Sequence, residues 1–255
     1  FKVFGNVMRC DDETVTPADS AQLMKELFLL AELDTEAEDL RREMDFSFSF
    51  AGVGRFRVNA YRQRGTLAAV LRSVPFELPD SGKLHIPDSI LSLAENQNGI
   101  ILVTGAAGSG KSTTLTCMID KINSERPGHI VTIEDPIEFL HKHKKSIISQ
   151  REIGIDTESY SDALRAALRQ SPNVILLGEM RDNETMSIAM TAAETGQLVL
   201  STLHTVGAAN TVDRIIDGFP TNQQQQIRMQ LSMVLKAVIS QQLLPDTNGT
   251  LYPVF

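Results

Sequence analysis

A glycine-rich segment of the chain has the residue types and the spacing that hold a phosphate chain. It fits the eight-position Walker A pattern, and its members are Gly105, Ala106, Ala107, Gly108, Ser109, Gly110, Lys111 and Ser112, with Thr113 directly after them. In this pattern backbone N–H groups wrap the phosphates, the lysine reaches the β- and γ-phosphates, and the hydroxyl after it ligates Mg²⁺. An apolar run at 100–104 and a helical pattern at 111–123 flank the segment, as the motif requires. The segment therefore predicts a nucleotide-binding loop.

Two acidic clusters follow apolar runs further along the chain. Glu179 comes after one run, and Glu134, Asp135 and Glu138 come after another. Open α/β sheets bind ligands at the carboxyl ends of their strands, so we expect these carboxylates beside the glycine-rich loop. They could orient Mg²⁺ or activate an attacking water, and both Glu179 and Glu138 are candidates for the general base. The candidate metal ligands, direct or through water, are Ser112, Glu134, Asp135 and Glu179.

Three basic side chains could act on the same phosphates. His204 closely follows the apolar run 198–201 and could report whether the γ-phosphate is present; the alternative is a hydrogen-bonded structural histidine. Arg57 and Arg72 lie on a predicted sheet before the loop, where the alternative is a polar strand face. In an oligomer such arginines could reach a neighbouring nucleotide, and an arginine finger can raise the rate about 10³- to 10⁵-fold. We assign all three as candidate catalytic residues.

The amino-terminal part of the chain predicts a small α+β domain. Thr16-Pro17 is a helix start, and the pair Thr35 and Glu38 has the spacing of a capping box. Apolar residues then alternate with polar ones, which is typical of strands with one buried face. The expected elements are helices at 17–33 and 35–44, strands at 46–50, 56–60 and 67–74, and a turn at 52–54. The polar segment 77–83 has the composition of a linker, which gives domains over 1–78 and 84–255.

Helices and strands alternate in the second domain. The expected strands are 100–104, 130–133, 174–177 and 198–201, and the expected helices are 87–95, 111–123, 161–169, 183–195, 208–217 and 222–243. This alternation predicts the α/β class, with a parallel sheet and right-handed crossovers. The last residues, 251–255, resemble the start of a further strand.

Composition excludes several classes of protein. The chain has 255 residues, 42% of them hydrophobic and 22% charged, which is typical of a globular protein. A net charge of -8 argues against non-specific binding to nucleic acid, and two cysteines, Cys10 and Cys117, cannot build a four-cysteine zinc site. No apolar run approaches the roughly 20 residues that span a bilayer, so we expect no transmembrane segment. The sequence opens on Phe1 without an initiator Met, and its last residues resemble a strand that is just beginning. We therefore expect it to lack the start of its first domain and the end of its second.

Four further segments follow the glycine-rich loop in a fixed order. They are IEDPIEF at 133–139, GEMRD at 178–182, AAETG at 192–196 and TLHT at 202–205. With the hairpin segments 45–48 and 55–59 and the segment 237–243, they extend over nearly the whole chain. In these motifs the chain resembles the secretion ATPase superfamily, and most of all its type IV pilus retraction ATPases.

The resemblance implies a PAS-like α+β domain over 1–78, followed by a RecA-like P-loop ATPase motor domain over 84–255. By position, Gly105 to Thr113 would be the Walker A segment of the family, Glu134 to Glu138 its Asp box, Gly178-Glu179 its Walker B segment and His204 its His box. Arg57 and Arg72 match arginines that family members contribute to the nucleotide pocket. The implied assembly is a homo-hexamer with ATP between its subunits.

The implied activity is Mg²⁺-dependent ATP hydrolysis that drives pilus retraction. Such a motor is cytoplasmic, and it acts at the inner face of the bacterial cytoplasmic membrane on a platform protein of the pilus in that membrane.

Other functions share part of this pattern. Motors for pilus extension and type II secretion have the same motor motifs but usually carry a four-cysteine zinc element. A RecA-like nucleic-acid translocase is a further alternative, although an acidic chain without Trp and with three Tyr offers little surface for stacking bases. A small-molecule kinase would not explain the arginine-bearing first domain. Lys111 and Glu179 argue against a catalytically silent ring subunit.

Overall fold

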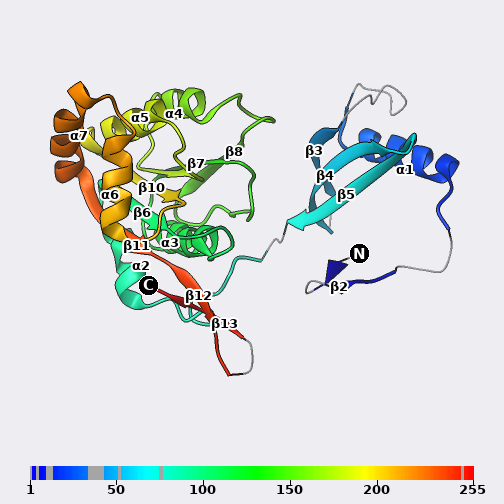
Figure 1. Ribbon diagram of the computed structural model, residues 1–255, viewed down its shortest axis with the longest axis horizontal. Helices are drawn as coiled ribbons and strands as arrows, with labels where there is room; N and C mark the ends of the chain where they lie inside the picture. Colours follow the sequence, from blue (N-terminus) through cyan, green and yellow to red (C-terminus); the bar gives the residue numbers. More distant parts are fainter. Residues whose placement is uncertain are drawn as a thin grey trace. The chain divides into compact units, whose positions relative to one another are not determined.

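The computed structural model describes residues 2–3, 6–9, 14–33, 43–50, 53–74, 77–247 and 250–255. The chain divides into two compact units, Phe1–Val74 and Pro75–Phe255, each of which is described by itself (Figure 1). The helix expected to begin at Thr35 lies outside the described residues, as does Cys10. Among the described residues no helix is both long enough and apolar enough to cross a membrane.

In the described part of the amino-terminal unit, a helix lies against a three-stranded antiparallel sheet. The strands pair in the order β3 (Met44–Phe50), β4 (Gly54–Gln63) and β5 (Thr66–Val74), and β1 (Lys2–Val3) pairs with β2 (Asn6–Val7). Helix α1 (Pro17–Leu30) begins after Thr16, which is its N-cap as predicted, and Thr16 also forms a capping box with Asp19 that was not expected. Phe28 from the helix packs edge to face on Phe46 from the sheet, with ring centroids 5.4 Å apart. The alternating strand pattern therefore buries one face of the sheet under α1.

A six-stranded parallel sheet forms the centre of the carboxy-terminal unit. The order of its strands is β11 (Leu235–Ser240), β6 (Gly99–Thr104), β10 (Leu198–Leu203), β9 (Val174–Leu177), β7 (His129–Glu134) and β8 (Ile147–Glu152). The helices are α2 (Asp88–Leu91), the 3-10 turn η2 (Ser92–Glu95), α3 (Lys111–Glu125), α4 (Tyr160–Leu168), α5 (Asn183–Glu194), α6 (Ala208–Asp217) and α7 (Thr221–Val234). A short antiparallel pair follows, β12 (Gln242–Pro245) with β13 (Leu251–Val254). The predicted parallel α/β sheet is confirmed.

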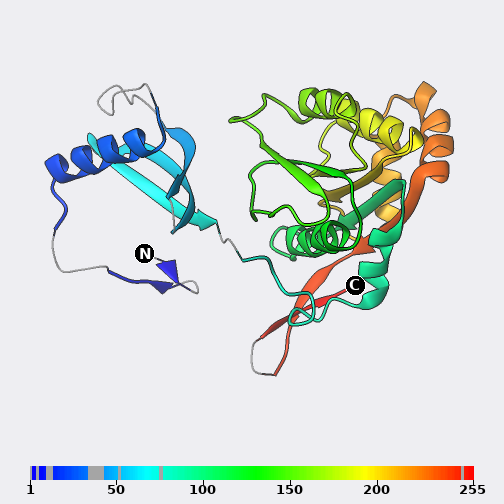
Figure 2. The ribbon, with the colours of Figure 1, turned by 180° about the vertical axis from the view of Figure 1, so that it is seen from behind.

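Both faces of the parallel sheet are covered (Figure 2). Ile100 and Leu102 of β6 join a core cluster that includes residues of α4, α5, α6 and α7. The alternate residues Ile101 and Val103 join the cluster under α3 and η2 on the opposite face. Because strands buried on both faces need apolar residues at every position, they read in the sequence as unbroken apolar runs.

The structure corrects the expected helix at 222–243. Helix α7 ends at Val234, and residues Leu235–Ser240 form the edge strand β11 beside β6. An apolar run of this length cannot be assigned to helix or strand by periodicity alone. Here the residues form a strand because they pair with β6. Strand β8, which was not expected either, pairs with β7 at the other edge.

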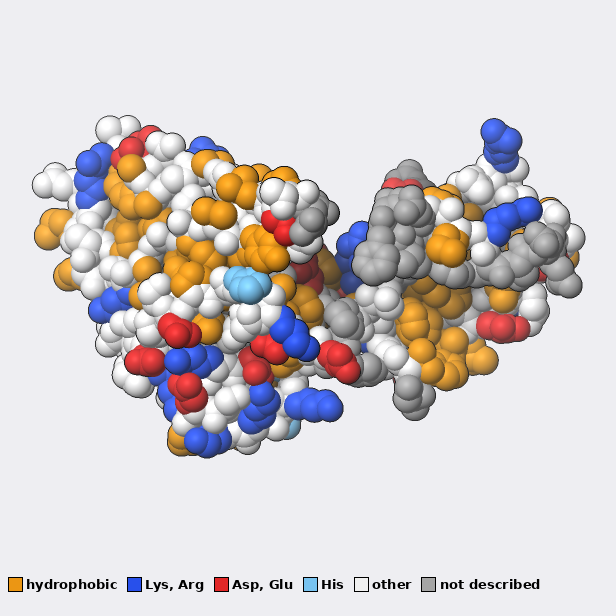
Figure 3. Space-filling view, turned by 90° about the horizontal axis from the view of Figure 1, so that it is seen from below, with side chains coloured by type: hydrophobic (Ala, Val, Ile, Leu, Met, Phe, Trp, Pro, Cys, Tyr) orange, Lys and Arg blue, Asp and Glu red, His pale blue; other side chains and the backbone are white. Residues whose placement is uncertain are grey.

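Charged side chains of both signs are interspersed on part of the visible surface of this unit, and hydrophobic side chains gather beside them (Figure 3). The described residues drawn on this face therefore mix positive and negative charge, whereas non-specific binding of nucleic acid needs a basic surface.

Candidate nucleotide-binding site

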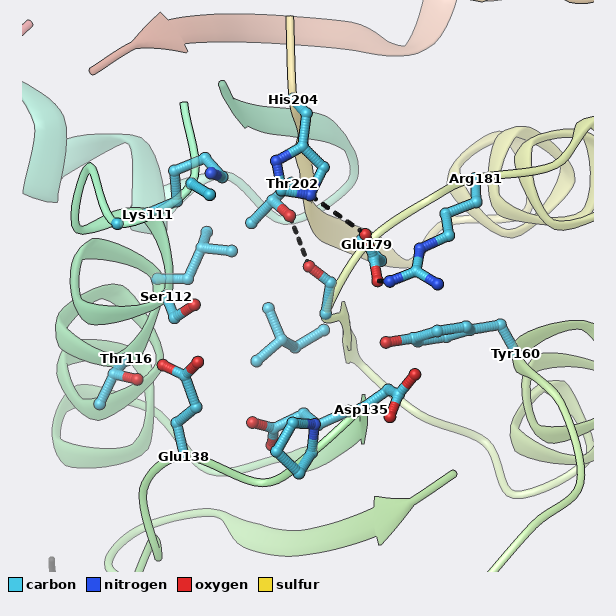
Figure 4. A pocket seen from close by; sticks show the side chains of 17 residues that line it. Lys111, Ser112, Thr116, Asp135, Glu138, Tyr160, Glu179, Arg181, Thr202 and His204 are labelled. Carbon is cyan, nitrogen blue, oxygen red and sulfur yellow. Dashed lines mark hydrogen bonds and ion pairs between the residues drawn. The ribbon is translucent and has the colours of Figure 1, made fainter. Parts of the chain in front are cut away.

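Four adjacent strands of the parallel sheet deliver the candidate residues to one pocket. The strands β6, β10, β9 and β7 are neighbours in the sheet, and their carboxyl ends lie at the same edge because all of them run in one direction. They lead into the glycine-rich loop, His204, Glu179 and Glu134, respectively. The pocket between these ends has a volume of about 260 Å³ (Figure 4). The candidates that line it are Ala107, Gly108, Lys111, Ser112, Glu134, Asp135, Glu138, Glu179 and His204.

The other members of the loop shape it from outside the pocket lining. Gly105, Ala106, Ser109 and Gly110 connect β6 to α3, and Thr113 lies in the first turn of that helix. At Gly108 the φ angle of +77° lies in the left-handed region, and no atom stands within 4 Å of an added Cβ. Glycine is therefore needed at Gly108 for its backbone conformation and not for space. The amino terminus of α3 borders the pocket, which favours an anion there.

Lys111 is buried and bends back onto its own loop. Its Nζ atom donates to the carbonyl oxygens of Gly105 and Ala106, at 3.0 and 2.9 Å. Burial lowers the pKa of Lys111, and the nearby carboxylates of Glu179 and Glu138 oppose that shift. The ammonium group is thus held at the edge of the pocket on neutral acceptors, which it can exchange for the oxygens of an anion.

Glu179 has both carboxylate oxygens engaged. Its Oε1 atom forms an ion pair with Arg181, and its Oε2 atom lies 3.3 Å from Nε2 of His204. Glu179 is only 8% exposed, whereas its two partners are exposed, so they hold the carboxylate from the solvent side. Sequence reasoning assigned no role to Arg181, although its position two residues after Glu179 was a usable signal: both follow the same strand end.

The second acidic cluster contains carboxylates in different surroundings. Oε1 of Glu134 accepts hydrogen bonds from Oγ1 of Thr132 at 2.6 Å and from Nε2 of Gln150 at 3.2 Å. Burial raises the pKa of Glu134 to about 7 despite these donors. The carboxylate of Glu138 points instead toward Ser112 (Figure 4). Glu138 is therefore the acidic group that faces the hydroxyl of the loop.

The candidate metal ligands do not make a metal cage by themselves. Among the described residues, no group of three or more His, Cys, Asp or Glu side chains is arranged to hold a metal ion. The carboxylates of Glu134, Asp135 and Glu179 thus line one pocket without converging on a common point, and any ion there needs further oxygen ligands.

Two side chains that sequence reasoning missed lie close to the backbone before Glu179. Oγ1 of Thr202 donates to the carbonyl oxygen of Gly178 at 2.6 Å. A Cβ on Gly178 would lie 2.9 Å from the hydroxyl oxygen of Tyr160, so that ring packs close above the glycine. Burial and the nearby carboxylates of Glu179 and Asp135 raise the pKa of Tyr160, which keeps its hydroxyl protonated. Thr202 belongs to the TLHT segment, whereas nothing in the sequence around Tyr160 indicated its place.

The two candidate arginines belong to the amino-terminal unit. Arg57 on β4 and Arg72 on β5 are directly opposite each other in the antiparallel pair. Because neighbouring residues of a strand point to opposite faces and Val58 is buried in the core, both arginines lie on the face away from that core. Arg57 is half-buried and Arg72 is exposed. The structure therefore places these two residues opposite each other on one face of the amino-terminal sheet.

Known proteins are similar to this chain in sequence and in fold. A family model described as type II/IV secretion system protein matches residues 63–249. The chain is 54% identical over 207 residues to a twitching motility protein of Neisseria gonorrhoeae, in a match that covers 81% of this chain and 55% of that protein. It is 49% identical over 207 residues to a type IV pilus retraction ATPase, PilT, of Pseudomonas aeruginosa. This match covers 81% of this chain and 60% of that protein.

A solved structure has the same arrangement of elements. The pilus retraction motor PilT with bound ADP superimposes with a TM-score of 0.81 at 57% identity, over 83% of this chain and 62% of that one. The chain therefore spans less than two thirds of the length of these relatives.

Proposed function

The chain belongs to the type II/IV secretion system protein family, and on that premise we propose that it hydrolyses ATP with Mg²⁺ and drives type IV pilus retraction, the activity behind twitching motility. One observation carries the proposal: four adjacent strand ends bring the glycine-rich loop, two acidic clusters and His204 into one pocket. The likeness to a retraction motor that holds ADP supports a nucleotide in this pocket.

The residues of the pocket fit a nucleoside triphosphate with Mg²⁺. Ser109 Oγ is buried in the loop with no hydrogen-bond partner among the described residues, so the loop has an unused polar group. Bound Mg²⁺ would neutralise negative charge on the β- and γ-phosphates. Ser112 would hold the ion, with Glu138 facing that hydroxyl and the lining carboxylates of Glu134, Asp135 and Glu179 acting through water.

In the proposed mechanism Glu179 orients the attacking water and takes its proton. His204 and Arg181 fix the two oxygens of its carboxylate, so the base is held in one orientation before the substrate arrives. Lys111 exchanges its loop carbonyls for phosphate oxygens and stabilises the negative charge that shifts during transfer. Glu138 is the competing candidate for the base.

The proposed assembly is a homo-hexamer with ATP between subunits. Residues 1–78 would be a PAS-like domain and residues 84–255 a RecA-like motor domain. Arg57 and Arg72 would then reach the pocket of a neighbouring subunit. Their register as opposite neighbours on one sheet face supports this, because two guanidinium groups side by side suit a single polyphosphate.

The segment between the units would be the hinge through which hydrolysis changes the angle between them. Residues from Asp80 onward form a hydrogen-bonded turn in which Leu84 N donates to Asp80 O and Ile86 N donates to Ser81 O. The Cys117 thiol also lies 3.5 Å from the carbonyl oxygen of Pro79, which ties that residue to α3. We therefore place the hinge before Pro79, in the first part of the expected linker.

The proposed site of action is the cytoplasmic face of the bacterial inner membrane. There the motor would act on the platform protein of the pilus, peripherally and without binding nucleic acid or zinc. The main alternative within the family is a motor for pilus extension or type II secretion, and a RecA-like translocase is less favoured.

The decisive experiment measures the ATPase rate of the full-length protein against its concentration, with the mass followed by light scattering and single-stranded DNA added in a parallel series. We expect a rate that rises with ring assembly, ignores DNA and is lost in Lys111→Ala. A cell that lacks its own retraction motor should recover twitching with the wild type only. Stimulation by DNA, or failure of the wild type to restore twitching in that cell, would reject the proposal.

A further inference from the structure

Gln241 contacts the chain on both sides of the phosphate loop. It follows β11, is only 2% exposed, and its backbone N–H donates to the carbonyl oxygen of Thr104 at 2.8 Å. Its Oε1 atom accepts a hydrogen bond from Oγ1 of Thr114, also at 2.8 Å. Thr104 is the last residue of β6 and Thr114 lies in the first turn of α3, so one side chain and its backbone connect the elements that bracket the loop.

The loop itself packs closely on the same residue. A Cβ on Gly105 would lie 2.2 Å from the carbonyl oxygen of Gln241, and a Cβ on Gly110 would lie 2.9 Å from its Nε2 atom. Gly105 and Gly110 are the first and last glycines of the loop. The two glycines thus give Gln241 room to approach both ends of the loop, in addition to allowing the positive φ angles found there.

We propose that Gln241 is a positioning residue that keeps the loop in its phosphate-binding conformation before nucleotide arrives. The inference rests on the proposed function in that the loop is taken to bind a nucleotide. Gln241 does not line the pocket, so it acts through Gly105, Gly110 and Thr114 and not by touching the ligand. A loop that is already ordered loses less conformational entropy on binding, which tightens the complex.

The polar contact with Thr114 is what distinguishes this role from simple packing. Thr114 is 1% exposed, so without Gln241 its hydroxyl would be buried with no acceptor there. A buried hydrogen bond of this kind fixes a relative position of two elements that apolar contact alone leaves adjustable.

The test compares variants that keep the size of the Thr114 or Gln241 side chain and remove its hydrogen-bonding group. Thr114→Val and Gln241→Met each remove one partner of the hydrogen bond, and Thr114→Ser keeps the hydroxyl. Gln242→Met makes the same chemical change at the next residue, which is exposed, and serves as the matched control. Three quantities are measured in the full-length protein: amide hydrogen exchange of residues 105–112 without nucleotide, ADP affinity by calorimetry, and the melting temperature.

We expect Thr114→Val and Gln241→Met to speed amide exchange in the loop and to weaken ADP binding about five-fold, the size of one neutral hydrogen bond. The double variant should bind ADP no more weakly than either single one, because both remove the same contact. Thr114→Ser and the control at Gln242 should behave as wild type. Unchanged exchange and affinity in Thr114→Val, even with a lower melting temperature, would overturn the proposal and leave Gln241 a packing residue.

Failure of the proposed function gives a different pattern. If wild-type protein binds no ADP, the nucleotide assignment fails. The exchange experiment, which uses no nucleotide, still decides whether Gln241 orders the loop.

Discussion

Nε2 of His204 lies 3.3 Å from Oε2 of Glu179, although the two residues follow different strands. The contact exists because β9 and β10 are parallel neighbours in which Leu177 pairs with Ser201. Glu179 and His204 follow this pair by two and three residues, so they lie at nearly the same level along the sheet. Since Arg181 engages the other oxygen, the Glu179 carboxylate is oriented by two groups before any ligand is present. Glu138 is exposed and points toward Ser112 instead. This difference separates the roles of the two candidate bases.

Removal of the imidazole should slow hydrolysis without weakening substrate binding. In His204→Ala, Glu179 loses the partner of one oxygen, and we expect kcat to fall about 10-fold with KM nearly unchanged. His204→Gln, whose side-chain amide can still donate, should lose less. Steady-state kinetics of the two variants checks this, and a large rise in KM in both would show that His204 binds the substrate and does not orient Glu179.

The two candidate bases should respond differently to an isosteric amide. We expect Glu179→Gln to lower kcat about 10²- to 10⁴-fold at any Mg²⁺ concentration while nucleotide binding remains, because the proton acceptor is gone. Glu138→Gln should mainly raise the Mg²⁺ concentration needed for half-maximal rate. Rates of Glu179→Gln and Glu138→Gln are measured across an Mg²⁺ titration, with a chelator giving the Mg²⁺-free rate. The assignment is reversed if excess Mg²⁺ restores Glu179→Gln but not Glu138→Gln.

The sequence was sufficient to predict the edge of the sheet at which Lys111, Glu179 and His204 lie, but not that Arg181, Tyr160 and Thr202 line the same pocket. Each of the first three groups follows an apolar run, and in a parallel sheet all such positions share one edge. They meet in one pocket because β6, β10 and β9 are neighbours in the sheet, an order that the sequence did not show. What could not be predicted depends on packing between distant segments. Gln241 reaches the loop only because residues 235–240 form an edge strand, and the apolar run there fits a helix equally well.

The raised pKa of Glu134 could not be predicted from the sequence either. Its raised pKa comes from burial among neighbours on β7 and β8, and β8 itself was not expected. The sequence placed this carboxylate at the strand end but could not distinguish its surroundings from those of the exposed Glu138.

Folding stability should depend on pH through Glu134. Its pKa in the folded state, about 7, lies above its ordinary value of 4.5, so the folded protein holds this proton more tightly than the unfolded chain. The protonated side chain of Glu134 contributes fully to folding stability below pH 4.5, and this contribution is lost as the pH rises to about 7. The rise in pH should therefore lower the free energy of unfolding by on the order of 1–3 kcal/mol. Denaturant titrations of nucleotide-free protein at pH 5 and pH 8 measure the loss.

Glu134→Gln provides the comparison for that measurement. The amide cannot ionise and keeps an oxygen for the Thr132 hydroxyl, so the variant should lose less stability than wild type over the same pH range. Glu138→Gln removes a nearby negative charge that contributes least to the raised pKa of Glu134, so it should lessen the pH dependence only slightly. An identical pH dependence in wild type and Glu134→Gln would assign the effect to other groups.

The space above Gly178 should control the position of Glu179. Gly178→Ala puts a Cβ 2.9 Å from the Tyr160 hydroxyl oxygen, so either the ring or the backbone before Glu179 must move. We expect kcat to fall about 10- to 100-fold. Adding Tyr160→Phe removes the hydroxyl and should restore most of the rate. Tyr160→Phe alone should stay within a few-fold of wild type; if the double variant is as slow as Gly178→Ala, the obstruction lies elsewhere.

Arg57 should act on the pocket of a neighbouring subunit, and mixing two inactive variants tests this directly. Lys111→Ala subunits have a defective loop and an intact arginine, whereas Arg57→Ala subunits have the reverse. If the arginine acts in trans, mixed rings contain interfaces with both residues intact, about one quarter of the total in an equal mixture. ATPase activity should then appear on mixing and be absent from each variant alone.

Arg57→Lys should restore only part of the rate in the same assay, because lysine lacks the planar fork of donors. A mixture that stays inactive although light scattering shows mixed rings would place the action of Arg57 within its own subunit or remove it from the mechanism.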